Sequence, residues 1–251
     1  VKPTSGTIEI MGKPFNEKNL RDILASVGSL IESPSYYGHL TGRENMEIIR
    51  RLLDLPKKNI EEAVHIVRME NQMEKKVKNY SLGMKQRLGI AMALARFPKL
   101  LILDEPTNGL DPNQIMEVRR LIQEIAKDRA VLISTHILPE VQAVCDYIMM
   151  IEHGQKVFEG TINAFNTYMS PSALLTIMHN APSSEELMKI EGVVRVERLT
   201  NTRIRLHFKG DDSIIGRVVK LAVSKQWHLR EISLEKESLD KVFAKLSGKD
   251  A

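Results

Sequence analysis

Apolar and polar residues follow one another in blocks that predict a mixed α/β protein. Four apolar segments have the length of buried strands: Ser26–Ile31, Leu100–Leu103, Val131–Ser134 and Tyr147–Ile151. Segments with helical spacing separate most of them, and continuously apolar strands that alternate with helices are typical of a parallel sheet covered on both faces. We therefore expect the first two thirds of the chain to form an α/β core, with a hairpin strand at 156–158 after a turn at Gly154.

Capping residues and prolines mark the ends of the expected helices. Thr41 and Glu44 stand at capping-box spacing, and Pro56 breaks the helix that they open. The later helices are expected at 57–69, 81–96, 112–127 and 139–144. Those that come before residue 97 predict a helical subdomain, at about residues 36–96, inserted between the strands.

After Pro171 the order of the elements changes. The pattern predicts strands and helices in the order β-α-β-β-α-β, at 174–178, 184–190, 193–199, 202–208, 213–225 and 228–234. This order is that of the ferredoxin-like fold, and an amphipathic helix is expected after it at Leu239–Leu246. The sequence therefore predicts an α/β domain at 1–170 and a small α+β accessory domain at 171–251.

The composition excludes several classes of protein. Of the 251 residues, 43% are apolar and 27% are charged, a balance that argues against disorder. The longest apolar run, Ile90–Ala95, is far shorter than the ~18 residues that suggest a membrane span. The single cysteine, Cys145, excludes a disulfide scaffold and a cysteine-based zinc site. The net charge of +4 comes from mixed signs without a basic block, so no nucleic-acid partner is implied.

Two adjacent carboxylates, Asp104 and Glu105, come directly after the apolar strand Leu100–Leu103. Ligands bind at the carboxyl ends of the strands in sheets of this kind. One carboxylate can hold Mg²⁺ and the next can deprotonate an attacking water molecule. Taken alone, the pair is equally typical of a strand end at which two acids face solvent.

A second motif stands upstream, at the start of the helix expected over 81–96, and consists of Ser81, Leu82, Gly83 and Met84. The backbone N–H groups and the dipole at a helix start attract anions, although an ordinary N-cap by Ser81 explains the same residues. With Asp104 and Glu105 following it, the motif resembles the signature of the ATP-binding cassette (ABC) ATPases. Leu100–Glu105 then stands at the position of that family's Walker B motif.

The resemblance covers about residues 1–165 and implies catalytic roles. Asp104 would anchor Mg²⁺, and Glu105 would be the base for the water that attacks ATP. His136, in Ser134-Thr135-His136, stands where the family has its switch histidine and would contact the γ-phosphate.

The same resemblance implies that two subunits share each nucleotide. The signature residues 81–84 would contact an ATP molecule held by a second subunit. Gly109-Leu110-Asp111-Pro112 is similar to the family's D-loop, in which Asp111 would couple the two sites.

Glu32 stands where the family's Q-loop has a glutamine. A carboxylate there has a similar reach and can pair with Mg²⁺, Arg or Lys, so the resemblance implies that Glu32 binds the nucleotide or its metal. With the signature sequence, this acidic variant resembles the bacitracin and lantibiotic immunity exporters of Gram-positive bacteria. The alternative is that Glu32 is an exposed loop acid.

The motif Gly-x-x-x-x-Gly-Lys-[Ser/Thr], whose backbone cradles the phosphates of ATP, is absent from these residues. In the family this P-loop lies just before a segment such as Val1–Gly6. We therefore expect that the sequence begins after the P-loop and first strands of an ABC ATPase, and that these residues alone are inactive.

The resulting hypothesis is an ATP-hydrolysing subunit of an ABC exporter, with ATP and Mg²⁺ as cofactors. The resemblance implies a homodimer, an integral-membrane permease as partner and a place on the cytoplasmic face of a bacterial membrane. Two alternatives stay open at this point. One is a non-catalytic regulatory or assembly module without its own P-loop, and the other is an ABC protein that acts on ribosomes or DNA.

Overall fold

The structure is a computed structural model that describes residues 3–168, 171–209 and 213–236. The chain divides into two compact units, Val1–Val144 and Cys145–Ala251. This division falls ahead of the domain boundary expected at residue 170.

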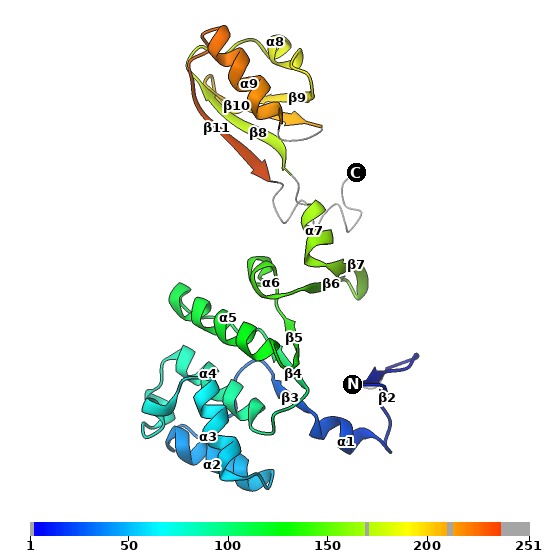
Figure 1. Cartoon of the computed structure of the whole chain (residues 1–251), viewed down its shortest axis with the longest axis vertical. Helices are drawn as coiled ribbons and strands as arrows, with labels where there is room; N and C mark the ends of the chain where they lie inside the picture. Colours follow the sequence, from blue (N-terminus) through cyan, green and yellow to red (C-terminus); the bar gives the residue numbers. More distant parts are fainter. Residues whose placement is uncertain (1–2, 169–170, 210–212, 237–251) are drawn as a thin grey trace. The chain divides into compact units, whose positions relative to one another are not determined.

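The first unit contains a three-stranded parallel sheet with the order β3-β4-β5 (Figure 1). Its strands are β3 (Val27–Leu30), β4 (Leu100–Asp104) and β5 (Ala130–Ser134). Each begins and ends within one residue of its predicted limits. In the register, Leu103 of β4 lies between Leu30 of β3 and Ile133 of β5.

The helices of this unit begin where the capping signals place them. Thr41 Oγ1 accepts a hydrogen bond from the Glu44 backbone, and the Glu44 carboxylate accepts one from Thr41 N at 2.7 Å, so the predicted capping box is present. The short helix α1 was not predicted, because its six residues are too few to show a helical period. The helices are α1 (Leu20–Ala25), α2 (Gly42–Leu52), α3 (Lys57–Ile66), α4 (Leu82–Leu94), α5 (Pro112–Ala126) and α6 (Leu138–Val144), and a small hairpin of β1 (Glu9–Ile10) and β2 (Lys13–Pro14) precedes them.

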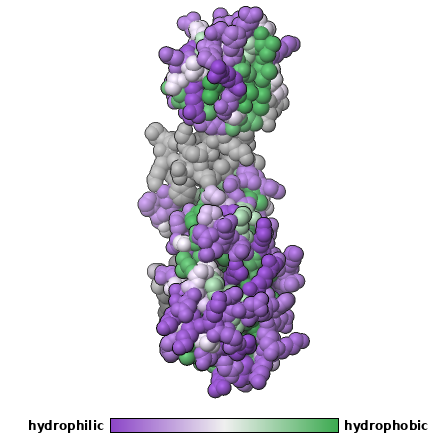
Figure 2. All heavy atoms as spheres, turned by 90° about the vertical axis from the view of Figure 1, so that its left-hand side faces the viewer, coloured by the Kyte–Doolittle hydropathy of each residue, from purple (hydrophilic) through white to green (hydrophobic). Residues whose placement is uncertain are grey.

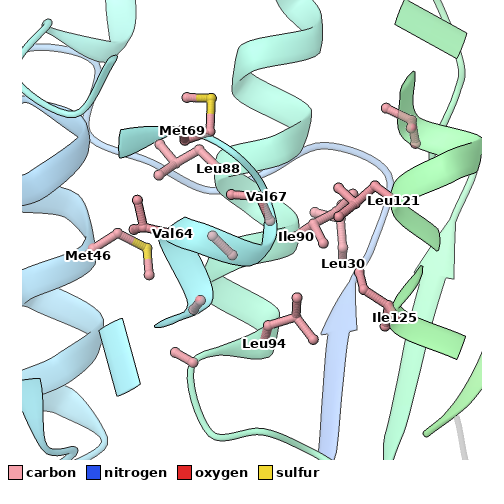
Figure 3. Close-up of a cluster of buried hydrophobic side chains, with 14 of the residues drawn as sticks. Leu30, Met46, Val64, Val67, Met69, Leu88, Ile90, Leu94, Leu121 and Ile125 are labelled. Atoms are coloured by element: carbon pink, nitrogen blue, oxygen red, sulfur yellow. The ribbon is translucent and has the colours of Figure 1, made fainter. Parts of the chain in front are cut away.

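One hydrophobic core joins the helical block to the sheet (Figure 3). Leu88, Ile90 and Leu94 of α4 are fully buried. Met46 of α2 and Leu30 of β3 belong to the same core, so α4 is the helix around which this unit packs. A helix enclosed in this way needs apolar residues around most of its circumference, and most residues of α4 are apolar or glycine.

One face of the parallel sheet is more open than the sequence predicts. Leu101 and Leu103 of β4 are fully buried, whereas Leu132 of β5 is 53% exposed and Ile31, after β3, is 57% exposed. The expectation of a sheet covered on both faces is therefore wrong for the residues that the structure describes. The side of the first unit that Figure 2 draws is mostly polar.

The fourth predicted strand forms, but it does not extend this sheet. It is β6 (Tyr147–Glu152), which pairs antiparallel with β7 (Gln155–Thr161), so the predicted hairpin is confirmed. The turn consists of His153 and Gly154, both with positive φ. Two successive residues with positive φ are what a two-residue type I′ hairpin turn requires. The local turn therefore gives β6 its antiparallel neighbour β7.

The rest of the second unit is a four-stranded antiparallel sheet with the order β11-β8-β10-β9 (Figure 1). The elements follow one another as β-α-β-β-α-β, as predicted, and Trp227 is buried in their core. The helix expected at Leu239–Leu246 lies outside the described residues, and none of the described helices could span a membrane. The elements are α7 (Ile162–Tyr168), β8 (Pro171–Met178), α8 (Ser184–Met188), β9 (Val193–Arg198), β10 (Arg203–Phe208), α9 (Ser213–Ser224) and β11 (Leu229–Lys236).

Gly28 of β3 leaves no room for a side chain against α4. A Cβ atom at this position would lie 2.2 Å from the carbonyl oxygen of Ala93 and 2.8 Å from Pro98 Cγ. We expect Gly28→Ala to lower the free energy of unfolding by about 1–3 kcal/mol, the usual cost of overpacking. The matched control is Ser29→Ala on the same strand, where the side chain is exposed and the change should stay within about 0.5 kcal/mol. Urea unfolding followed by circular dichroism measures both, and equal stabilities would contradict this packing.

Candidate functional site

The candidate catalytic carboxylates lie where β4 ends. Asp104 is the last residue of β4, and Glu105 follows it with a φ of 46°, in the left-handed region. For a residue other than glycine, this conformation costs on the order of 1–3 kcal/mol. The Glu105 N–H donates to the carbonyl oxygen of Ser134 at 2.9 Å, and this hydrogen bond to the end of β5 holds the turn.

Three groups that follow β5 contact the Glu105 carboxylate. Thr135 Oγ1 donates to Oε2 at 3.1 Å, and the His136 backbone N–H donates to Oε1 at 3.1 Å. The His136 Nδ1 atom lies 2.7 Å from the same Oε1. The Glu105 side chain is 26% exposed and that of His136 is 72% exposed. The carboxylate is thus held in one position while water can still reach it, which is the geometry that a general base needs.

Asp104 is oriented by the neighbouring strand in a similar way. It pairs with Ser134 in the register, and the Ser134 hydroxyl donates to Asp104 Oδ1. Among the described residues, no group of three or more His, Cys, Asp or Glu side chains is placed to hold a metal ion. Mg²⁺ in nucleotide sites is bound by one or two carboxylates, with water and substrate phosphates as further ligands. Asp104 therefore fits an Mg²⁺ ion that arrives with a nucleotide.

Glu32 lies at the same edge of the sheet. It follows β3 by two residues, as Glu105 follows Leu103 by two, and Leu30 pairs with Leu103. The parallel register therefore places Glu32 and Glu105 after neighbouring strand ends. Glu32 has a φ of 53° and an exposed side chain. Its part in nucleotide or metal binding stays a prediction.

The predicted signature residues lie at the start of α4. Ser81 is the N-cap, and its hydroxyl accepts a hydrogen bond from the Met84 backbone at 3.2 Å. The Gly83 N–H donates to Gln114 Oε1 of α5 at 3.0 Å. A Cβ atom at Gly83 would lie 2.6 Å from that oxygen, so the contact requires glycine. In the single chain, the N–H groups of Gly83 and Met84 therefore already have acceptors, and the N-cap by Ser81 is present.

The predicted D-loop lies against the signature residues. Asp111 caps α5, and its carboxylate accepts hydrogen bonds from the backbones of Asn113 and Gln114, both at 3.0 Å. Gly109, with a φ of 74°, approaches the side chain of Leu82. In the described part of the chain, no hydrogen bond joins this group to Asp104 or Glu105. The predicted site residues thus form two groups, one at the strand ends and one at the starts of α4 and α5.

Sequence reasoning missed three residues that complete these groups: Ser134, Thr135 and Gln114. Ser134 and Thr135 stand beside the predicted His136, and a hydroxyl next to a candidate site was the only available signal. Gln114 carried none, because its contact with Gly83 joins residues 31 positions apart.

An ion pair fixes the helix that follows the Thr135-His136 segment. The Arg119 guanidinium of α5 donates to the Glu140 carboxylate of α6, with Nε and Oε2 at 2.7 Å, and the Glu140 side chain is only 7% exposed. These hydrogen bonds raise the pKa of Arg119. The pair therefore holds α6, and with it the segment that contacts Glu105, against α5.

A parallel sheet with acidic side chains just after its strand ends is the arrangement at which α/β proteins bind their ligands. The model of the ABC transporter family matches residues 1–108. The bacitracin transport ATP-binding protein BcrA of Bacillus licheniformis is 37% identical over 261 aligned positions, which cover 99% of this chain and 81% of that protein. The chain therefore belongs to the ATP-binding proteins of ABC transporters.

Other relatives agree with this family. The lantibiotic transport ATP-binding protein SrtF of Streptococcus pyogenes is 42% identical over 160 positions, which cover 63% of this chain and 68% of that protein. Among solved structures, cbiO1 of Clostridium perfringens, part of the ABC transporter complex cbiONQ, matches with a TM-score of 0.62 and 28% identity. That match covers 66% of this chain and 70% of the solved one.

Asp111 has a structural role as the N-cap of α5, and this role can be tested apart from its proposed role in coupling two sites. Asp111→Ala removes the acceptor for two backbone N–H groups and should lower the free energy of unfolding by about 1 kcal/mol. Asp111→Asn keeps a capping oxygen and should leave stability almost unchanged. Urea unfolding of both variants measures the difference. Equal losses in the two variants would mean that the negative charge, rather than the hydrogen bonds, stabilises this helix start.

Proposed function

We propose that the chain is the ATP-hydrolysing subunit of an ABC exporter and couples hydrolysis to a separate membrane permease. The observation that carries the proposal is the Glu105 carboxylate, held by Thr135 and His136 at the end of β4. Similarity to the bacitracin and lantibiotic transport ATP-binding proteins supports a peptide antibiotic as the exported substrate.

In this proposal Glu105 accepts a proton from the water that attacks the γ-phosphate of ATP. When the His136 ring carries both protons, Nδ1 donates to Glu105 and the exposed Nε2 side can donate to a phosphate oxygen. Such a donor stabilises the charge that develops on the transferring group. Thr135 acts as a positioning residue, because its hydroxyl fixes the second oxygen of the Glu105 carboxylate.

Asp104 would hold Mg²⁺, with Ser134 keeping its carboxylate oriented. The ion would neutralise part of the phosphate charge when it is bound with ATP. Glu32, after the neighbouring strand, is proposed as a second acidic group toward the nucleotide or its metal. It would link the site to the helical subdomain, at about 36–96, which we propose faces the permease on the cytoplasmic side of the membrane.

The signature group at the starts of α4 and α5 would act on the nucleotide of a second copy. It has no hydrogen bond to Asp104 or Glu105 in the described part of the chain, which supports a role outside its own strand-end site. Two copies in a head-to-tail arrangement would then bring Ser81–Met84 of one subunit to the γ-phosphate bound by the other. Asp111, beside the signature residues, would couple the two sites.

We propose that residues 171–251 form a ferredoxin-like accessory domain joined to an ATPase domain at 1–170. The strand order β11-β8-β10-β9 supports this, because it places the first and third strands of the β-α-β-β-α-β unit in the middle. The hairpin β6–β7 would then belong to the end of the ATPase domain.

The 251 residues contain no P-loop, so we expect them to bind ATP weakly by themselves. Isothermal titration with MgATP should give little heat. It should give clear binding once a segment containing Gly-x-x-x-x-Gly-Lys-[Ser/Thr] has been joined ahead of Val1. Tight Mg²⁺-dependent binding by the unextended chain would contradict this expectation, and no binding by either would favour a non-catalytic regulatory module.

In the extended chain, Glu105→Gln should retain ATP binding but hydrolyse ATP at least about 100-fold more slowly, because the amide cannot accept the proton. The matched control is Glu61→Gln on α3, an exposed carboxylate outside both groups, which should leave turnover unchanged. Release of inorganic phosphate measures turnover and equilibrium titration measures binding. Undiminished hydrolysis by Glu105→Gln would remove Glu105 from the role of base.

A further inference from the structure

The edge strand β9 of the second unit has one unpaired side. β9 (Val193–Arg198) pairs with β10 and is the last strand in the order β11-β8-β10-β9. An unpaired edge offers backbone N–H and C=O groups to another strand, and proteins usually block such edges. In the described part of the chain, no second strand pairs with β9. The helix α8 contacts β9, and the Arg198 side chain donates to the carbonyl oxygen of Pro182 and to Ser184 Oγ, so these contacts involve side chains and leave the backbone edge without a strand partner.

The register shows which backbone groups of β9 point outward. Leu199 N donates to the carbonyl oxygen of Arg203 at 3.0 Å, and hydrogen-bonded pairs alternate with non-bonded pairs along an antiparallel ladder. Counting back, Glu197 with Arg205 and Arg195 with His207 are the bonded pairs. The backbone groups of Val196 and Arg198 therefore point away from β10, towards a potential partner strand.

Two opposite charges stand side by side on this edge. Arg195 and Glu197 are two positions apart and so lie on the same face of the sheet. Glu197 pairs with Arg205 at 3.1 Å and lies 3.5 Å from His207 Nε2, whereas Arg195 is exposed and has no ion pair among the described residues. Hydrogen bonds from Arg205 lower the pKa of Glu197, so this carboxylate stays charged at neutral pH.

Only some pairings of β9 with a second copy of itself are compatible with these charges. When two copies of a strand pair antiparallel about a two-fold axis, side chains that stand opposite each other lie on the same face of the sheet. The axis must therefore lie where one residue stands opposite the same residue of the partner. An axis at position 195 would oppose two arginines, and an axis at 197 would oppose two glutamates. With the axis at Val196, Arg195 stands opposite the partner's Glu197 and Glu197 stands opposite the partner's Arg195. The outward backbone N–H and C=O groups of Val196 then face those of the partner's Val196.

We propose that two copies of this chain associate through β9, paired antiparallel about Val196, so that their four-stranded sheets become one continuous sheet. Charge complementarity between Arg195 and the partner's Glu197 sets the register, and the backbone hydrogen bonds of Val196 join the strands. This contact goes beyond the function proposed above, because no nucleotide takes part in it. It should therefore form without ATP, whether or not the chain hydrolyses ATP.

A disulfide across the proposed axis tests the register directly. In a Cys145→Ser background, Val196→Cys places two thiols opposite each other, at a Cα separation near the 5.5 Å of a bonded pair, which a disulfide can span. Mild oxidation without nucleotide should give a covalent dimer on a non-reducing gel. Arg203→Cys, exposed on the inner strand β10, is the matched control and should stay monomeric on the gel. Equal cross-linking of both variants, or none at Val196→Cys, would overturn the proposal.

A charge reversal tests the complementarity. Arg195→Glu places two carboxylates opposite each other on both sides of the axis. It should raise the dissociation constant of the dimer about tenfold or more, as measured by sedimentation equilibrium without ATP. Lys220→Glu makes the same change of charge on the exposed side of α9 and should leave association unaltered. A wild-type chain that is monomeric at all concentrations, or equal effects of both variants, would overturn the proposal. Neither result would bear on Glu105, because hydrolysis is not measured.

Discussion

The parallel register between β4 and β5 is the constraint on which the candidate site depends. It pairs Asp104 with Ser134 and lets the Glu105 N–H donate to the Ser134 carbonyl oxygen just beyond the last paired residue. Side chains alternate between the faces of a sheet, so a shift of one residue would turn each of them to the opposite face. The burial of Leu101 and Leu103 opposes a one-residue shift, because such a shift would turn both side chains out of the core. The apolar half of β4 therefore positions the acidic residues that follow it.

Much of this could be predicted from the sequence because the signals are local. A continuous apolar strand followed by two acids, a serine at a helix start and the Thr41–Glu44 capping pair each lie within a few residues. The contacts that complete the site are not local. Thr135 and Gln114 lie about 30 positions from the groups they contact. Thr135 at least stands beside the predicted His136, whereas nothing in the neighbourhood of Gln114 distinguishes it from other polar residues. An apolar segment such as that of β6 predicts a strand without showing which strand it pairs with; only the turn at Gly154 indicated the neighbour that β6 has.

The signature group shows how a helix start can be both a structural cap and a candidate binding site. In the single chain, Ser81 and Gln114 accept hydrogen bonds from the Met84 and Gly83 N–H groups. A phosphate at this helix start would have to displace one of these acceptors or use the remaining N–H groups. Gln114 lies in the first turn of α5, and its backbone N–H donates to the Asp111 carboxylate that caps this helix. A displacement of Gln114 would therefore change the hydrogen bond at Asp111. The geometry thus offers a direct mechanical link between nucleotide contact at α4 and the D-loop at the start of α5.

The two contacts proposed between copies differ in what they require. The head-to-tail contact needs ATP in both strand-end sites, so it would form and break with each cycle of hydrolysis. The β9 contact needs only the chain itself. Two ATPase units tethered through their second units meet at an effective concentration set by the connection between them, and not by the concentration of the protein. The closing step would then be intramolecular, and its equilibrium would respond to nucleotide alone. The β9 edge would in this way keep two copies together. ATP binding, and not the diffusional meeting of two subunits, would then control the proposed transport cycle.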